Sequence, residues 1–438
     1  MAPSKIRRRI KIGCSALVLF VLAVLAVGWM RANHLDRQAQ KRWRQVLDNR
    51  TFLEAYPPVD INDTALRLVT LAAPLGIDLA PPEADISPTV SEEKREVFKA
   101  LNESWRPWLA ELRKYEGENR PPLSQEVEAF LAQHEDALDE LIRTLNSTSP
   151  PQWKRDIRNG FSSKLPNLLG ILYLQRVLMF EALQRAEAFE DPSPVLEASW
   201  RLRSNLHESP YLIEALIDIA NLHMQMMALR GSCMADSRWT DRLEATDLRR
   251  RVLIGFHHES WVAWWSSHLE QPLGDEQLPG WAKPMNRIGL RDFARRFSRT
   301  VEDLPGQAPL TFHSQDFFES HYQAIPRWQV ITRLFYPNFF DSWTKAIRAE
   351  LDADLTARIL RVRANPPRAL DVRSPRWTEP SRVEGLNWIY ERDTDSLTIH
   401  LDGQLAESLD ETLSLRFEIF QSGNEWSCPP TGLPDATN

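Results

Sequence analysis

Three His-Glu dipeptides are the residues of this sequence whose types come closest to a hydrolytic metal site. They are His134-Glu135, His207-Glu208 and His258-Glu259. In zinc proteases that carry such a pair, a second histidine stands one helical turn later, so that both imidazoles face one zinc ion. The positions where that histidine would stand hold Leu138, Tyr211 and Val262. The spacing therefore excludes this type of zinc site at all three pairs.

Two looser groups of side chains have metal-binding residue types. They are His257, His258, Glu259 and His268, and then His313, Asp316 and His321. On a helix, His257 and His268 share a face but lie about 16 Å apart, beyond the reach of one ion. We interpret both groups as surface or structural residues and expect neither metal nor cofactor. The sequence has no G-x-S-x-G, Walker or G-x-G-x-x-G motif, which favours a non-enzyme. A nucleophile whose partners are assembled only by the fold stays open.

A group of tryptophans is the first of two candidate binding surfaces. Trp261, Trp264 and Trp265, with Trp281 nearby, could stack on the sugar rings of an envelope polymer. Steps of three and four residues place the first three on one helix face, and core packing is the favoured interpretation.

A polar stripe is the second candidate surface. Glu214, Asp218, Asn221 and Gln225 follow one another at helical spacing in an otherwise apolar segment. The stripe is either the solvated edge of that helix, which is the favoured interpretation, or the lining of a polar cleft between helices. Together, the candidate binding-surface residues are Trp261, Trp264, Trp265, Glu214 and Asp218.

The elements that must position these residues are mostly helices. Ser91 and Ser124 are favourable N-cap residues, and they predict helices over 91–114 and 124–146. A helix over 165–188 is apolar around much of its circumference and is expected to be central and buried.

Short connections link the next helices. Ser193-Pro194 and Ser209-Pro210 place a cap residue before a proline, the order favoured at helix starts, and the second begins a helix over 211–230. With the helix over 165–188, these predict antiparallel hairpins of the kind that solenoids use, although we find no fixed repeat period.

Helices are expected to continue over 236–268 and, after a loop at 272–284, over 289–301, and a further long helix is expected over 339–363. In the last, Asp354 and Arg358 are expected to pair on the outer face.

After Pro366-Pro367 the hydrophobic period changes from helical to two. Trp388 and Tyr390 form the first short run; the second holds Leu397, Ile399 and Leu401, and the third holds Leu413, Leu415, Phe417 and Ile419. Alternation over three such runs predicts a small C-terminal antiparallel sheet.

The N-terminus carries a membrane-anchor signal. Residues 12–30 form a run of 19 without a charge. As a helix they span about 28 Å, close to the hydrocarbon thickness of a bilayer. Basic residues precede the run and also follow it, and the leading cluster is tighter, which favours an N-terminus in the cytoplasm. A helix over 33–56 is expected to continue out of the membrane.

A cleaved signal peptide is the main alternative to this anchor. Its apolar core is shorter and ends in an A-x-A site, which this segment lacks, so the uncleaved anchor is favoured. Outside the membrane, Cys233 and Cys428 could form a disulfide, but the sequence leaves their pairing open.

The remainder of the chain is acidic. Residues 1–45 hold ten of the 53 basic residues and one of the 60 acidic residues, which leaves a net charge of −16 on the rest. A surface of this sign repels phosphate backbones, so we expect no nucleic-acid partner.

Two segments carry a resemblance to a known class of proteins. They are EVEAFLAQHEDALDELIR (126–143) and LPNLLGILYLQRVLMFEALQRAEAFEDPSPVLEASWRLRSNLHESPYLIEALIDIA (165–220). They resemble uncharacterised, signal-anchored, mostly helical envelope proteins of environmental bacteria, whose motif is matched by Leu206, Pro210, Leu212, Ile213, Leu216 and Ala220. Members end in a helix and a small sheet that is similar to the tail of secretion pseudopilins. Here the helix-then-strand order is kept without the tyrosine-proline and aspartate-proline-glycine signatures, and the resemblance implies no activity.

These expectations give a mainly α fold class with an N-terminal transmembrane helix, a solenoid-like antiparallel helical domain and a small C-terminal sheet. The predicted regions are a cytoplasmic tail (1–11), the transmembrane helix (12–30), a juxtamembrane helix with a proline-rich connection (31–90), the helical domain (91–365), the β subdomain (366–428) and a flexible tail (429–438).

The expected function is a scaffold or protein-interaction module of the bacterial envelope, held in the inner membrane through residues 12–30 with its bulk extracytoplasmic. Its partner is expected to be another envelope protein, which the sequence does not identify. The alternative is a hydrolase or binding protein that acts on cell-wall or surface polysaccharide.

Overall fold

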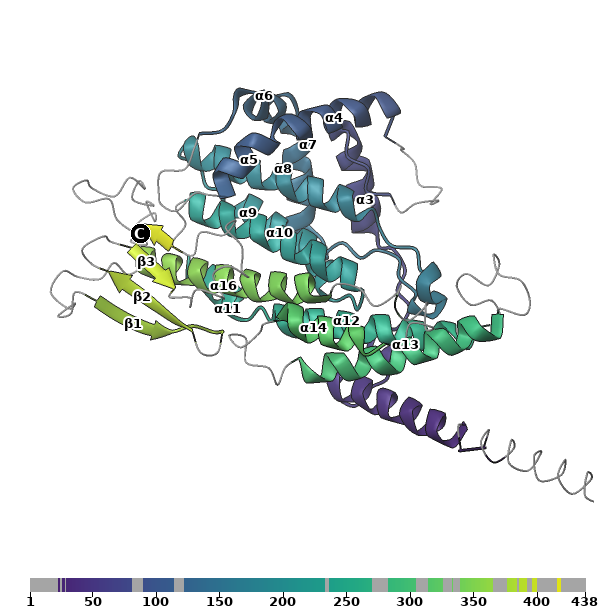
Figure 1. Ribbon diagram of the computed structural model, residues 1–438. Helices are drawn as coiled ribbons and strands as arrows, with labels where there is room; N and C mark the ends of the chain where they lie inside the picture. The colour runs from purple at the N-terminus through teal and green to yellow at the C-terminus, as the bar shows by residue number, and fades with distance from the viewer. Residues whose placement is uncertain are drawn as a thin grey trace, which may run out of the picture.

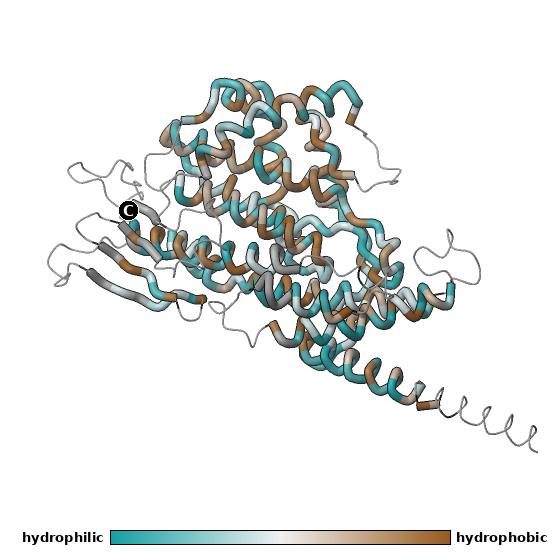
Figure 2. The backbone as a smooth tube through the Cα atoms, viewed as in Figure 1, coloured by the Kyte–Doolittle hydropathy of each residue, from teal (hydrophilic) through white to brown (hydrophobic). Residues whose placement is uncertain are grey.

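The fold is mainly α-helical, as the sequence predicts. The computed structural model describes residues 23, 26, 27, 29–80, 90–113, 122–232, 236–269, 283–304, 314–325, 333, 339–364, 376–383, 386–391, 396–399 and 416–418. Along most helices, hydrophilic and hydrophobic residues alternate (Figure 2), as expected where one side of each helix packs inward.

The N-terminal part of the described chain is a helix over residues 29–46, followed by α2 (Phe52–Ala55), α3 (Asp63–Ala72) and the 3-10 turn η1 (Ala73–Leu75). The prediction of one helix over 33–56 is wrong. The chain turns at Asp48 and Asn49, whose φ angles are 53° and 67°. Aspartate and asparagine tolerate this left-handed conformation, which a helix cannot continue. Thr51 then opens α2 with a capping box to Glu54.

The next four helices are α4 (Glu92–Ser104), α5 (Arg106–Arg113), α6 (Gln125–Gln133) and α7 (Glu135–Ser147). Ser91 and Ser124 cap α4 and α6 as predicted, each accepting a hydrogen bond from a backbone N–H three residues on. Each predicted single helix is instead a pair. The first is interrupted at Trp105, two residues before Pro107, which has no N–H to continue the helical hydrogen bonds.

Three consecutive helices form the centre: α8 (Leu168–Glu187), α9 (Ser193–His207) and α10 (Leu212–Gly231). The prediction that α8 is central and buried is confirmed, because ten of its residues are buried. The predicted caps of the next two helices are wrong. Pro192 and Tyr211 are the N-cap residues of α9 and α10, and neither makes a side-chain cap hydrogen bond.

The remaining helices are α11 (Ser237–Glu244), α12 (Leu248–Ser266), α13 (Lys283–Asp303), α14 (Ser314–Gln323) and α16 (Phe339–Ala364). The prediction of helices over 236–268 is confirmed, and they are two, α11 and α12. The chain leaves the helix after Glu244, and the Asp247 side chain accepts a hydrogen bond from the Arg250 backbone N–H to start α12. Most of the predicted loop at 272–284 lies outside the described residues.

The helices are stacked in layers (Figure 1). Helices α4 to α7 lie at one end, α8, α9 and α10 follow, then come α16 with α12, and α13 lies beyond α12. The helix over residues 29–46 crosses the far end, next to α13. Helix α10 contacts α8, α9, α12 and α16, so most of its length is packed against other helices.

Four short strands lie beside α16 (Figure 1): β1 (Arg376–Pro380), β2 (Asn387–Glu391), β3 (Ser396–Ile399) and β4 (Arg416–Glu418). They pair antiparallel in that order, with Trp388 opposite Ile399 and Leu397 opposite Phe417. Leu401 and Leu413, which belong to the predicted runs, lie outside the described residues.

One carboxylate joins this sheet to α16. Asp354 is 3% exposed and accepts hydrogen bonds from the Trp388 indole at 2.7 Å and from the Ser381 hydroxyl at 2.9 Å. The predicted pairing with Arg358 is present at 3.3 Å. The prediction that this pair lies on the outer face of α16 is wrong, because Asp354 faces the sheet.

Among the described residues, α10 is long and apolar enough to cross a membrane, but 61% of its most apolar window is buried inside the protein. Its contacts with four other helices identify it as a core helix. Residues 12–22 of the predicted anchor lie outside the described residues. At the anchor's end, Val27, Trp29 and Met30 are exposed.

Candidate functional site

The polar stripe of α10 lies in the protein interior. Glu214, Asp218, Asn221 and Gln225 are each at most 1% exposed. The favoured interpretation of this stripe as a solvated edge is therefore wrong, because helices surround α10. Its side chains instead form polar contacts between helices. Gln225, for example, donates a hydrogen bond from its amide nitrogen to the Leu196 carbonyl of α9 at 3.1 Å.

Asp218 is the centre of a buried ionic cluster. Arg203 from α9 donates from Nε to Oδ1 at 2.9 Å and from Nη2 to Oδ2 at 3.3 Å. Arg251 from α12 places its Nε 3.4 Å from Oδ2, and His207 places its Nδ1 at the same distance. Burial opposes ionisation of this carboxyl, but the two guanidinium groups outweigh it and hold the pKa of Asp218 well below its usual range.

Glu214 lies one helical turn before Asp218, but nearby positive charges offset the effect of its burial less completely. Burial raises the pKa of its carboxyl, and the charges of Arg155 and Arg251 oppose that shift only in part. Its Oε1 atom has no hydrogen-bond partner among the described residues. The cluster thus contains three guanidinium groups, those of Arg155, Arg203 and Arg251, and two carboxyl groups. Asp218 is ionised, whereas burial favours the neutral form of Glu214. The cluster therefore carries more positive than negative charge.

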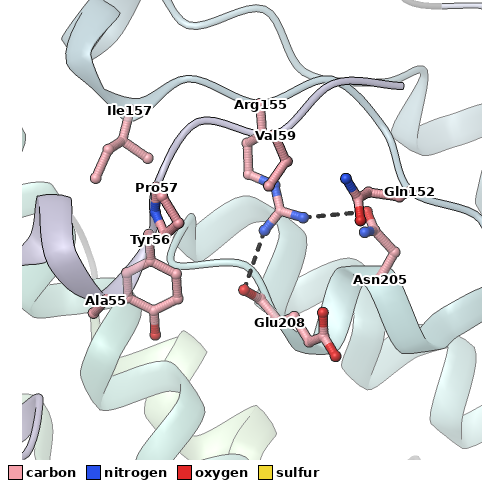
Figure 3. A pocket seen from close by; sticks show the side chains of 9 residues that line it. All are labelled: Ala55, Tyr56, Pro57, Val59, Gln152, Arg155, Ile157, Asn205 and Glu208. Atoms are coloured by element: carbon pink, nitrogen blue, oxygen red, sulfur yellow. Dashed lines mark hydrogen bonds between the residues drawn. The ribbon is translucent and has the colours of Figure 1, made fainter. Parts of the chain in front are cut away.

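Two cavities open beside this cluster, and Tyr56 lines both. The first has a volume of about 350 Å³ and is shown in Figure 3. Arg155 points into its centre, where Nη1 donates to the Glu208 carbonyl at 3.1 Å and Nη2 donates to Asn205 Oδ1 at 3.3 Å. The guanidinium of Arg155 therefore already has acceptors within the protein.

The second cavity has a volume of about 470 Å³. It is lined by Val46, Leu47, Asp48, Arg50, Tyr56, His207, Ser209, Ala245, Asp247, Arg250, Arg251 and Ile254. These residues come from the end of the N-terminal helix, from both ends of α2, from the turn between α9 and α10, and from the start of α12. Three arginines and a histidine thus meet two aspartates at this cavity.

The tryptophans of the predicted binding surface pack against the N-terminal helix and the chain that follows it. Trp261 is 5% exposed, stacks on Trp265 with ring centroids 5.4 Å apart, and contacts Phe52 at the same distance. Trp264 contacts Trp43 of the N-terminal helix at 5.6 Å. Core packing, the favoured interpretation, is therefore confirmed for Trp261. Trp281 lies outside the described residues.

In the first histidine group, His257 and His258 are buried in α12, whereas His268 follows the end of that helix and is exposed. His257 is 2% and His258 0% exposed, and burial lowers the pKa of each to about 3. Both ring nitrogens of His258 lack a hydrogen-bond partner among the described residues, and its ring contacts Tyr211 at 4.6 Å. Burial raises the pKa of the neighbouring Glu259 to about 7. These imidazoles are neutral packing groups.

Within the described part of the chain, no three His, Cys, Asp or Glu side chains are placed to share a metal ion. His313, Cys233 and Cys428 lie outside that part, so the second histidine group and the possible disulfide stay predictions.

The sequence reasoning found Glu214 and Asp218 but missed their arginine partners. Arg203 shares a helix face with Leu196, Ser199 and Leu206. A charged residue in such an apolar stripe is almost never buried without a partner, which is the signal that could have identified it. No local pattern singles out Tyr56 or Arg155, because the fold alone brings these two residues to the cavity.

Comparisons with models of protein families, with curated proteins and with solved structures gave no match.

Proposed function

We propose that this chain is a membrane-anchored, non-catalytic interaction module of the bacterial envelope. In this proposal residues 12–30 cross the inner membrane, the N-terminus lies in the cytoplasm, and the helical body lies outside. The charge-free length of that segment and the basic cluster before it support the proposal.

The observation that carries the proposal is the docking of the helix over residues 29–46 on the body. Ala39, Trp43 and Leu47 are each at most 3% exposed and form a hydrophobic cluster with Phe52, Tyr211 and Trp261. A free linker would be polar and solvated along its length. A docked helix instead holds the body at a fixed position relative to the membrane segment that precedes it.

Ion pairs add to this docking. Arg295 of α13 donates from Nε to Asp36 Oδ1 at 2.7 Å, and both side chains are at most 16% exposed. Arg42 pairs with Glu302, also of α13. At the other end of the helix, Asp48 pairs with Arg250 of α12 at 3.1 Å. Charged contacts spaced from Asp36 to Asp48 give the docking one register.

A fixed body suits a scaffold that presents one surface to a neighbouring envelope protein. The body is also acidic, and that charge disfavours nucleic acid as the partner. The alternative function on polysaccharide requires aromatic rings that are free to stack on sugars. Trp261 and Trp264 use their rings in contacts within the chain, so no observation favours that alternative.

In-cell crosslinking of the full chain tests this function. Photo-crosslinking side chains placed in turn at exposed positions of the body, for example at Val97 and at Ile213, should capture the same envelope protein from positions on one surface. The matched control carries the crosslinker at the buried Leu174, where capture of a partner is not expected. Failure to enrich any envelope protein from any exposed position would contradict the proposal.

A further inference from the structure

Arg251 is a buried cation whose side-chain N–H groups have no hydrogen-bond acceptor among the described residues. It is 5% exposed, and Nε, Nη1 and Nη2 all lack a hydrogen-bond partner among the described residues. Asp218 lies 3.4 Å from Nε, but it already accepts two hydrogen bonds from Arg203. A guanidinium carries five N–H donors, and leaving such donors unpaired in the interior is costly. An acceptor beside Arg251 would remove that cost.

The second cavity is the space in which such an acceptor can sit, because Arg251 lines it together with Arg50, Arg250 and His207. Its acidic residues are already engaged. Asp48 pairs with Arg250, and Asp247 accepts the backbone N–H of Arg250 at 2.9 Å as the cap of α12. Cationic groups around a concave site with low-dielectric walls raise the local concentration of anions.

We propose that this cavity binds an oxyanion, a phosphate or carboxylate group of a ligand that is absent from the structure. The planar fork of arginine matches two oxygens of either group, and the Tyr56 hydroxyl at the cavity wall can donate one hydrogen bond more. The volume of about 470 Å³ is within the usual range for small-molecule sites. Arg155 in the first cavity has its acceptors within the protein, and this contrast selects the second cavity.

This site goes beyond the proposed function, which assigns no ligand, and it does not depend on the membrane anchor. A phosphate group could come from a free solute or from a lipid headgroup. The two sources share the chemistry of the site, so the experiment includes a probe for each.

The test is calorimetric titration of the full chain in maltoside detergent at constant ionic strength. The probes are inorganic phosphate, citrate and the short-chain lipid dihexanoyl phosphatidylglycerol. Saturable binding of phosphate or citrate supports a free solute, and saturable binding of the lipid alone supports a headgroup. Replacement of Arg251 would disturb the core, where this residue is buried. The test variant is therefore R50Q/R250Q, which changes two side chains at the cavity rim.

The matched control is R67Q/R143Q, which removes the same charge from exposed positions on α3 and α7. Binding should be about tenfold weaker in R50Q/R250Q and unchanged in R67Q/R143Q. Thermal denaturation of both variants without ligand checks that they are folded. The site is overturned if no probe binds saturably, or if both variants bind as the unaltered chain does.

Discussion

Trp43 of the N-terminal helix and Trp264 of α12 lie with their ring centroids 5.6 Å apart, at an interplanar angle of 60°. This contact joins residues 221 positions apart in the chain and covers the aromatic face on which the predicted sugar site depended. The candidate binding surface is therefore an internal contact between the N-terminal helix and the rest of the helical body.

Replacement of Trp43 tests this joint. W43A should release the helix over residues 29–46, because truncation of a buried aromatic side chain costs about 3–5 kcal/mol. The measurement is the rate of trypsin cleavage after the basic residues of this helix, which should rise strongly. W29A is the control, since Trp29 is 68% exposed on the same helix and its loss should leave the rate unchanged.

The pair between Asp36 and Arg295 should contribute to the same docking. R295D places two carboxylates against each other, and the charge-exchanged variant D36R/R295D restores an attractive pair. A double-mutant cycle on the thermal midpoint should give a coupling of about 1–2 kcal/mol, as expected for neighbouring charges with little solvent exposure. Equal destabilisation by the single and the double variant would show that the pair does not hold the helix.

Asp218 should be the most sensitive carboxylate of the body. D218N leaves the buried Arg203 and Arg251 without a counter-charge, and breaking a buried pair from one side costs about 3–5 kcal/mol. Urea denaturation measures the loss. The control D139N removes a carboxylate that is 50% exposed and pairs with Arg185, so its cost should stay below about 1 kcal/mol.

The buried imidazole of His258 predicts a specific loss of stability in acid. Burial lowers its pKa from an ordinary value of 6.5 to about 3, so only the unfolded chain takes up the proton between these values. Stability therefore falls as the pH drops below 6.5, by up to about 1.4 kcal/mol per pH unit. H258F keeps a planar aromatic ring but cannot titrate, and it should lose about 2 kcal/mol less stability than the unaltered chain between pH 6.5 and 4.5.

The measurement is the urea midpoint at these two pH values. H34F is the matched control, since His34 is exposed on the N-terminal helix. Identical pH dependence in H258F and in the unaltered chain would mean that His258 is not buried in its neutral form.

Local sequence signals were sufficient for much of this fold. Ser91 and Ser124 identify the starts of α4 and α6, because an N-cap acts through backbone groups only three residues away. The apolar circumference of residues 165–188 identifies α8 as a buried helix for the same reason, since periodicity is a property of the segment itself.

The errors arose where distant residues decide the outcome. The stripe from Glu214 to Gln225 has the spacing of a solvated edge, and only the packing of α8, α9, α12 and α16 around it makes it a buried network. The missed turn at Asp48 is an error of another kind, because it depends on two left-handed residues within a helical pattern. The cavity beside Arg251 is formed by segments from four parts of the chain, so no local pattern predicts it.

Membrane fractionation of the full chain in a bacterial host tests the central proposal most directly. We predict that the protein sediments with the inner membrane, resists alkaline carbonate extraction, and loses its body to protease added outside spheroplasts. A chain recovered as a soluble, protease-protected protein of the cytosol would contradict the anchor, the topology and the proposed role in the envelope.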